Sequence, residues 1–543
     1  MTLPLAFRTA SSARPEPVTV RETFEDVDAR RPLQRFAVGT VLAVAMVKTL
    51  LVFPFLARYG WHRDELYYFA AGHHPALGYV DFPPVVPLLG AAARCLFGSS
   101  LVGLRSLSLV AGAGVIELTA LTARELGGGG YAQVLAAVAI GFSPLLLATN
   151  MAFQTVSFDQ LAWSALLFAF VRLLRTGGRR LWPIVGALAG VALMTKYTVA
   201  LLLVALAIGL LAHGSGRRLL GGRGPRPGPS GPLSGIPGPS GPLRGIRGPL
   251  VAAGVCLVIV SANLSWQVDH GWVSAEFLWG HNAGGRQSSL FGGYLKDVAL
   301  LAGPLGLVLA VAGLRRLARI PTWRPLAWAA ALPLVGFALL GGKGYYGAPA
   351  FVILFAAGAV SAEHWTSGGR LRWARLVVPA VAMASLIPAL PTIVPVLSRS
   401  SMVAGGTWES RKDYADEIGW PELVDSVAAA WQGLDPGDRA HAAVVTSNYG
   451  EAGAIDLYGP ARGLPPAVSG HLTYRYWSPI RPDATIAVVV GVTAPTLQRW
   501  CLSGDEVGRV SNRAGVGNEE VGRPVSVCRL RNGVVPLWRA LTR

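Results

Sequence analysis

Residues 58–87 concentrate side chains that can carry out acid–base or metal chemistry. The stretch includes His62, Arg63, Asp64, Glu65, His73, His74 and Asp81. A carboxylate within reach of a hydroxyl group can take its proton during an attack on another molecule. The three histidines and the acids could hold zinc or another divalent metal ion, although their spacing matches no structural zinc signature. The alternative interpretation is a solvated loop with aromatic residues at the depth of lipid headgroups.

The rest of the chain has the composition of a membrane protein. Of its 543 residues, 52% are hydrophobic and 14% are charged, and the mean hydropathy is +0.44. These values argue against a soluble globular protein and predict several membrane-spanning helices. A charged cluster at the mouth of a membrane helix costs free energy, so we expect residues 58–87 to have a function.

Eleven segments between residues 36 and 397 are candidates for spanning helices. They are 36–56, 101–122, 131–150, 159–175, 181–196, 197–213, 249–267, 297–314, 325–342, 347–363 and 376–397. A span needs about 20 apolar residues, so the shorter segments would require tilt or a thin bilayer. The apolar piece 83–97 is short and begins with two prolines, and we expect it to lie along the membrane surface.

Arginine placement predicts the orientation of these segments. With the N-terminus in the cytoplasm, the inside loops are rich in arginine, whereas the outside loops hold few basic residues. Cytoplasmic loops are typically basic, so this orientation accounts for the net charge of +18 without a nucleic-acid partner. We expect residues 1–35 to form a disordered cytoplasmic tail and the Gly/Pro-rich loop 214–248 to be a flexible linker.

Residues 398–543 have mixed polarity and predict a small soluble α/β domain. The expected elements are helices near 421–431, 451–458 and 495–500 and strands near 441–447 and 485–491. Strands that alternate with helices are typical of such domains. Eleven crossings from a cytoplasmic start place this domain outside the cell membrane, where Cys501 and Cys528 could form a disulfide if the fold brings them close.

Under this topology, further polar residues collect at the outer ends of the spans. They are Asp159, Lys196, Arg286, Lys343, Tyr345 and Tyr346. Each one alone is typical of a snorkelling or solvated side chain. Their placement on the same side as the first outer loop, 58–100, favours one common site.

Five short motifs follow one another along these segments. They are R-D-E-L-Y-Y at 63–68, G-Y-V-D-F-P-P at 78–84, S-F-D-Q-L at 157–161, T-K-Y-T at 195–198 and G-G-K-G-Y-Y at 341–346. Their order resembles glycosyltransferase family 39, which holds the dolichyl-phosphate-mannose protein mannosyltransferases and the bacterial aminoarabinose lipid A transferase. The resemblance covers residues 36–397 and implies the multi-spanning C-type glycosyltransferase fold.

The resemblance implies inverting transfer of a sugar from a polyprenyl-phosphate carrier to a protein, lipid or cell-wall glycan acceptor at the outer face. It places the catalytic base at Asp64, with Glu65 orienting the site and Asp159 supporting it or binding the acceptor. The residues expected to bind substrates are Arg63, Asp81, Lys196, Arg286, Lys343, Tyr345 and Tyr346. The resemblance requires no cofactor. Whether the histidines bind a divalent metal ion stays open.

Two other classes of protein remain as alternatives. A transporter or flippase for lipid-linked sugars predicts repeated, broken spans with charges at mid-bilayer, whereas these charges lie at span ends. An envelope-binding membrane scaffold would leave the cluster at 58–87 without a role. The C-terminal motifs N-Y-G-E-A-G-A-I-D at 448–456 and S-G-H-L-T-Y at 469–474 resemble the bacterial sugar-transferase branch, with no catalytic role assigned.

Overall fold

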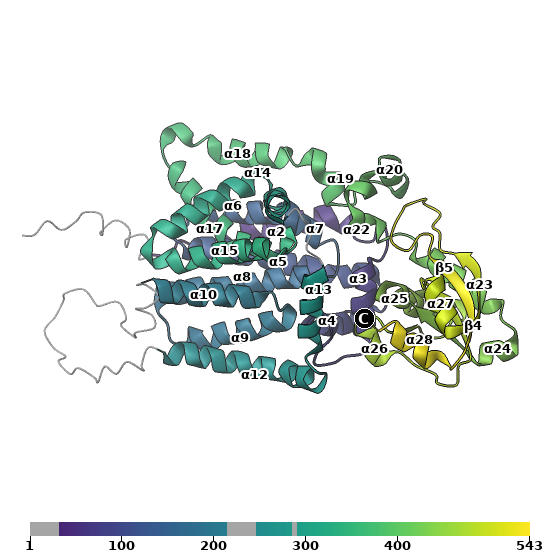
Figure 1. The fold of residues 1–543 in the computed structure, drawn as a ribbon. Coiled ribbons are helices and arrows are strands. Elements are labelled where there is room, and N and C mark those ends of the chain that lie inside the picture. Colours follow the sequence, from purple (N-terminus) through teal and green to yellow (C-terminus); the bar gives the residue numbers. More distant parts are fainter. Residues whose placement is uncertain (1–31, 214–245, 285–289, 543) are drawn as a thin grey trace, which may run out of the picture.

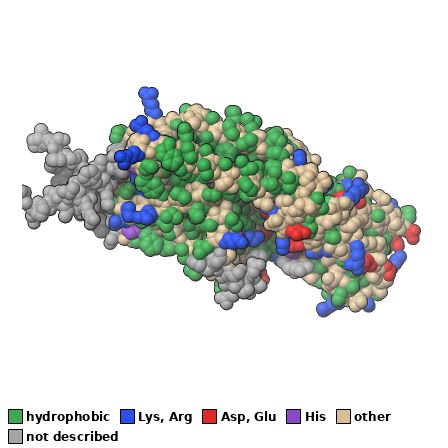
Figure 2. All heavy atoms as spheres, turned by 90° about the horizontal axis from the view of Figure 1, so that it is seen from above, with side chains coloured by type: hydrophobic (Ala, Val, Ile, Leu, Met, Phe, Trp, Pro, Cys, Tyr) green, Lys and Arg blue, Asp and Glu red, His purple; other side chains and the backbone are tan. Residues whose placement is uncertain are grey.

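The computed structural model describes residues 32–213, 246–284 and 290–542. Most of the predicted N-terminal tail and of the predicted linker 214–248 lies outside these ranges, as does Arg286. In Figure 1 the long helices run side by side in one bundle, and the C-terminal domain lies at one end of it. Figure 2 shows hydrophobic side chains covering much of the bundle, whereas the C-terminal domain carries charges of both signs.

Helices occupy all eleven predicted spans. Within the described residues, seven helical segments are long and apolar enough to cross a membrane: Val38–Phe55, Leu101–Glu125, Thr155–Thr176, Arg247–Asp269, Gly293–Arg319, Gly344–Trp365 and Gly369–Ile393. The other predicted spans are the shorter helices α6 (Gly130–Gly141), α9 (Leu181–Thr195), α10 (Val199–Ala212) and α15 (Arg324–Leu339). The predicted fold class, a helical multi-spanning protein with a small α/β domain, is confirmed.

Small residues let the central helices approach closely. Helix α14 (Leu290–Arg319) packs along α17 (Phe351–Trp365), which is buried over most of its length. A Cβ atom on Gly313 would lie 2.0 Å from the carbonyl oxygen of Leu354, and one on Gly358 would lie 2.0 Å from that of Leu309. Because lipid offers no hydrophobic driving force between helices, such close packing is a main source of their association.

Two short helices follow the first span at the end of the bundle that carries the C-terminal domain. These are α3 (Arg63–Ala71) and α4 (Val85–Phe97), which pack against each other. Helix α4 has the bounds expected for the apolar piece 83–97. Its position along the membrane surface stays a prediction.

The C-terminal domain is built on a five-stranded sheet with the strand order β2-β1-β3-β5-β4. The strands are β1 (Ala442–Thr446), β2 (Val468–Ser469), β3 (Ile486–Val490), β4 (Cys501–Arg509) and β5 (Pro524–Leu530). Strand β1 pairs in parallel with β2 and β3, whereas β5 is antiparallel to both β3 and β4. Its helices include α23 (Trp420–Gln432), α25 (Tyr449–Tyr458), α27 (Ala494–Trp500) and α28 (Val534–Ala540).

The five elements predicted for this domain are all present, but three strands were missed. Strands β2 and β4 lack the buried apolar pattern because β2 has two residues and β4 is mostly exposed. Strand β5 carries Cys528, which forms a disulfide with Cys501 at the start of β4, with Cα atoms 5.6 Å apart. The structure therefore makes the disulfide whose partners the sequence suggested.

A buried ion pair joins the first span, α3 and α5 (Leu101–Glu125). Glu65 and Arg105 are both 0% exposed. Arg105 Nε donates to Glu65 Oε1 at 2.7 Å, and its Nη2 donates to Glu65 Oε2 at 2.6 Å and to the Gly60 carbonyl at 2.9 Å. Arg105 also donates to the Leu56 carbonyl, and the backbone N–H of Phe153 donates to Glu65 Oε1 at 2.7 Å. This network holds α3 at the mouth of the bundle.

The C-terminal domain adds a second carboxylate to this network. Glu417 Oε2 lies 3.5 Å from Arg105 Nη2. A Cβ atom on Gly60 would lie 2.6 Å from the Glu417 carbonyl oxygen, and the φ of Gly60 is 131°, so this close approach requires glycine. Burial raises the pKa of Glu417 to about 7, although the charge of Arg105 opposes this rise.

We predict that Arg105→Met destabilises the protein strongly. The change keeps much of the side-chain volume but leaves the buried carboxylate of Glu65 without its cation, which typically costs about 3–5 kcal/mol. Thermal unfolding of the detergent-solubilised protein should show a large fall in midpoint. The control is Arg509→Met, because Arg509 pairs with Glu506 on the exposed surface. Equal midpoints for the two variants would contradict the anchoring role.

The pKa of Glu417 predicts a pH dependence of stability. An acid whose pKa is higher in the folded than in the unfolded protein holds its proton more tightly when folded. Folding stability is therefore lost as pH rises from the ordinary value of 4.5 towards the folded value of about 7. Glu417→Gln should flatten this part of a thermal-midpoint profile, and Glu506→Gln should not. An unchanged slope in Glu417→Gln would assign the pH dependence to other groups.

Candidate active site

The first turn of α3 presents Asp64. His62 caps this helix, since its Nδ1 accepts from the Asp64 backbone N–H at 3.1 Å and its own N–H donates to Glu65 Oε2 at 2.8 Å. Asp64 is partly exposed, whereas Glu65 is fully buried. The positive end of the helix dipole favours a negative charge at Asp64. Asp64 is thus an accessible carboxylate on a rigid support.

Tyr67 and Tyr68 lie between Asp64 and Asp81, the third acid of the first loop. The Tyr67 hydroxyl lies 2.8 Å from Asp81 Oδ1 and 2.7 Å from the Thr473 hydroxyl of the C-terminal domain. Burial raises the pKa of Tyr68 well above its usual value, and the charges of Asp64 and Asp81 raise it further. Burial also raises the pKa of Asp81 to about 7, although the Tyr67 hydroxyl opposes this. Both carboxylates therefore face the same region.

Lysines and tyrosines from distant segments form the opposite side of this region. The Lys196 Nζ, at the end of α9, lies 4.5 Å from the ring centre of Tyr346 and 5.5 Å from that of Tyr345. The Lys343 Nζ lies 5.9 Å from the Tyr345 ring centre. Tyr345 in turn is close enough to Asp64 to interact with its charge. These cations and hydroxyls can bind an anionic group near Asp64.

Asp159 is almost fully buried, unlike Asp64. It is 1% exposed, near the start of α8 (Thr155–Thr176), and the charge of Lys196 acts on it. Its Oδ1 has no hydrogen-bond partner within the described part of the chain. This placement favours the predicted supporting role, through Lys196, over direct contact with an acceptor.

The remaining predicted residues are held elsewhere. Arg63 is 2.6 Å from Glu519 and 3.0 Å from Glu520, so its contacts are with the C-terminal domain. The His73 Nδ1 is 3.0 Å from the Phe69 carbonyl oxygen, and the His74 ring stacks on Trp477. Among the described residues, no group of three His, Cys, Asp or Glu is arranged to hold a metal ion. The substrate contact expected for Arg63 stays a prediction, and a metal ion at the histidines stays open.

The C-terminal domain supplies residues that the sequence did not single out. The Tyr449 hydroxyl, at the start of α25, donates to Asp64 Oδ1 at 2.8 Å. Helix α25 lies against α3 because Gly450 and Gly453 carry no side chain, since a Cβ atom on Gly453 would lie 2.9 Å from the Leu66 Cβ. The hydroxyl of Thr473 accepts from the Val80 N–H at 3.0 Å. The motifs at 448–456 and 469–474 thus dock the domain onto α3 and the first loop.

Together these features define a class of membrane protein. A bundle of apolar helices carries a partly exposed carboxylate at one end, the charge of this carboxylate acts on Tyr345 in a cluster of lysines and tyrosines, and a small α/β domain contacts it. This is the arrangement of a multi-spanning membrane protein with an enzyme-like site at one membrane surface.

Comparisons with known proteins agree with this class. The family model of the dolichyl-phosphate-mannose-protein mannosyltransferases matches residues 81–226. The chain is similar in fold to ArnT from Cupriavidus metallidurans in the apo state, with TM-score 0.57 and 15% identity over 93% of this chain and 99% of that chain. ArnT bound to undecaprenyl phosphate gives TM-score 0.55 and 16% identity over the same shares. The predicted family resemblance and C-type glycosyltransferase fold are confirmed, and they support a membrane glycosyltransferase.

The oligosaccharyltransferase from Archaeoglobus fulgidus, tethered with an acceptor peptide, is more remote, with TM-score 0.45 and 14% identity over 78% of this chain and 63% of that chain. A search of curated proteins gave no match.

We predict that Gly453→Leu weakens the docking of the C-terminal domain. The new side chain would collide with Leu66 at the contact between α25 and α3. Overpacking of this kind typically costs about 1–3 kcal/mol. Limited proteolysis and thermal unfolding of the full chain should report a looser domain. Gly437→Leu is the matched control, because a Cβ atom there meets nothing within 4 Å. A wild-type proteolysis pattern in Gly453→Leu would contradict this contact.

Proposed function

We propose that the protein transfers a sugar from a polyprenyl-phosphate carrier to a hydroxyl group of a protein, lipid or cell-wall glycan. The observation that carries the proposal is the partly exposed Asp64 carboxylate facing the Lys343–Tyr345 side of the site. The match to a mannosyltransferase family model supports the reaction class. The similar fold of a protein bound to undecaprenyl phosphate supports the carrier. Neither a flippase nor a scaffold needs an accessible carboxylate beside cations.

The reaction is a single displacement at the anomeric carbon. The acceptor oxygen forms a bond to this carbon while its proton passes to Asp64, and the bond between the carbon and the carrier phosphate breaks. Attack from the face opposite the phosphate inverts the anomeric centre and requires no enzyme nucleophile. The Tyr449 hydroxyl donates a hydrogen bond to Asp64 Oδ1, so we assign acceptance of the proton to Asp64 Oδ2.

The leaving group gains negative charge in this step. The carrier starts as a phosphate diester and departs as a phosphate monoester, which takes the bonding electron pair. Cations and hydroxyl donors held in place before the reaction stabilise such charge without reorganisation. We assign this role to Lys196, Lys343 and the Tyr345 hydroxyl, which form one cluster.

The proposal also places the reaction on the outer face of the cell membrane. The disulfide between Cys501 and Cys528 is of a kind that persists in oxidising compartments outside the cytoplasm. The loops expected on the other side of the membrane are rich in arginine, which is typical of cytoplasmic loops. The disulfide and the distribution of arginine between the loops thus support the same orientation of the protein in the membrane.

We predict that Asp64→Asn lowers the rate of transfer by roughly a hundred- to ten-thousandfold, which is the usual contribution of a general base. The change keeps the shape of the side chain but removes the proton acceptor. Single-turnover transfer from a saturating polyprenyl-phosphate donor, in reconstituted membranes, measures this step. Binding of the donor should change much less, because we assign its phosphate to Lys196 and Lys343.

Three further variants separate the roles. Lys343→Ala should weaken donor binding as well as slow the step, and Tyr449→Phe should slow the step by roughly ten- to hundredfold through loss of one charged hydrogen bond. Glu506→Gln, on an exposed strand of the C-terminal domain, is the control with unchanged rate. Near wild-type turnover in Asp64→Asn, together with loss in Asp159→Asn, would move the base to Asp159.

A further inference from the structure

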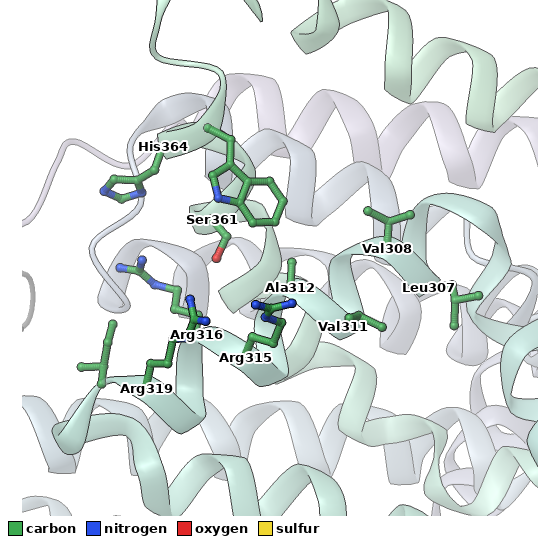
Figure 3. Close-up of a pocket in the computed structure, with 11 residues that line it drawn as sticks. Leu307, Val308, Val311, Ala312, Arg315, Arg316, Arg319, Ser361 and His364 are labelled. Atoms are coloured by element: carbon green, nitrogen blue, oxygen red, sulfur yellow. The ribbon is translucent and has the colours of Figure 1, made fainter.

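A hollow lies between the C-terminal parts of α14 and α17. Its volume is about 790 Å³. Arg315, Arg316 and Arg319 project from α14 towards Ser361 and His364 of α17 (Figure 3). The other lining residues are Leu307, Val308, Val311, Ala312, Ile320 and Trp365. We call this hollow the arginine pocket.

The arginine pocket belongs to the opposite membrane surface from the candidate active site. Helix α17 follows Tyr345 and Tyr346 and runs for 15 residues from Phe351 to Trp365. At 1.5 Å per residue this corresponds to about 22 Å. The pocket therefore lies at the end of the bundle away from the C-terminal domain, close to the depth of the other lipid headgroups.

Three arginines line the arginine pocket, and its lining residues within the described part of the chain include no acid. Arg315, Arg316 and Arg319 lie within two turns of one helix. The neighbouring acid, Glu363, accepts from the Gly129 N–H at 2.7 Å and from the Ala132 N–H at 3.3 Å, so its carboxylate caps α6 instead. The pocket thus attracts an anion, and guanidinium groups bind phosphate oxygens well.

The other wall of the arginine pocket is apolar and faces the lipid side of the bundle. Leu307, Val308 and Val311 lie one to three turns before the arginines on α14 and are 45%, 60% and 57% exposed. Trp365 is also exposed, at the end of α17, where tryptophan is typical of a membrane interface. A small soluble anion would leave this apolar wall unused, whereas an acyl chain would cover it.

We propose that the arginine pocket binds an anionic phospholipid in the leaflet opposite the active site. The phosphate group contacts Arg315 and Arg319, and one acyl chain lies along Leu307, Val308 and Val311. Basic pockets between membrane helices are suited to such headgroups, with about 1 kcal/mol for each arginine near the surface. The site is separate from the sugar-transfer site and does not depend on the reaction proposed for it.

Native mass spectrometry of the full chain released from detergent tests this proposal. Phosphatidylglycerol or phosphatidylcholine is titrated, and the apparent dissociation constant of the first bound lipid is measured. The wild-type protein should prefer phosphatidylglycerol, and Arg315→Gln with Arg319→Gln should reduce this preference roughly ten- to thirtyfold. Arg370→Gln with Arg372→Gln is the matched control, because both are exposed at the same end of the bundle but outside the pocket.

Two further arms make the result decisive. Val308→Asn with Val311→Asn should weaken binding of phosphatidylglycerol while all three arginines remain. Inorganic phosphate added as competitor should not displace the lipid at millimolar concentration. If the Arg370/Arg372 control lost its preference for phosphatidylglycerol equally, the preference would come from general surface charge. If inorganic phosphate displaced the lipid efficiently, the pocket would be a site for free anions. Either result overturns the proposal, and thermal unfolding of each variant confirms that it is folded.

Discussion

The buried pairing of Glu65 with Arg105 is the interaction on which the rest of this structure depends. Both groups are fully buried, so their hydrogen bonds have no competing water and little freedom of geometry. Neighbouring residues on a helix point about 100° apart. Once Glu65 is turned inwards to Arg105, Asp64 must face sideways into the site. The two acids of one dipeptide thereby acquire different surroundings: Glu65 is fully buried, whereas Asp64 is partly exposed.

The C-terminal domain completes this site. It reaches Asp64 through Tyr449, Asp81 through Thr473 and Tyr67, and Arg63 through two glutamates. These contacts join residues about four hundred positions apart, as in the Tyr67–Thr473 pair with a separation of 406. A domain without an assigned role in the sequence motifs thus forms part of the surroundings of the proposed base.

Three buried charged residues of the apolar helices lie near a polar or charged residue of another segment. Lys48 on α2 (Val38–Val52) contacts Asn150, Arg105 on α5 contacts Glu65, and Asp159 on α8 is close to Lys196. Each of these residues is costly to bury alone, so the partner selects how the two helices pack. Near the other end of α14, arginines line an open hollow between this helix and α17.

The sequence alone indicated the helical segments, the change to alternating strands and helices after residue 397 and the two cysteines that could pair. Apolar run length and strand–helix alternation are local properties, and the motifs are visible as spacing. Only the tertiary structure showed that Glu65 is buried against Arg105, and only it revealed Glu417, Tyr449 and strands β2, β4 and β5. These features depend on contacts between distant segments: a buried arginine within an apolar run signals that a partner exists, but the fold alone decides which acid it meets.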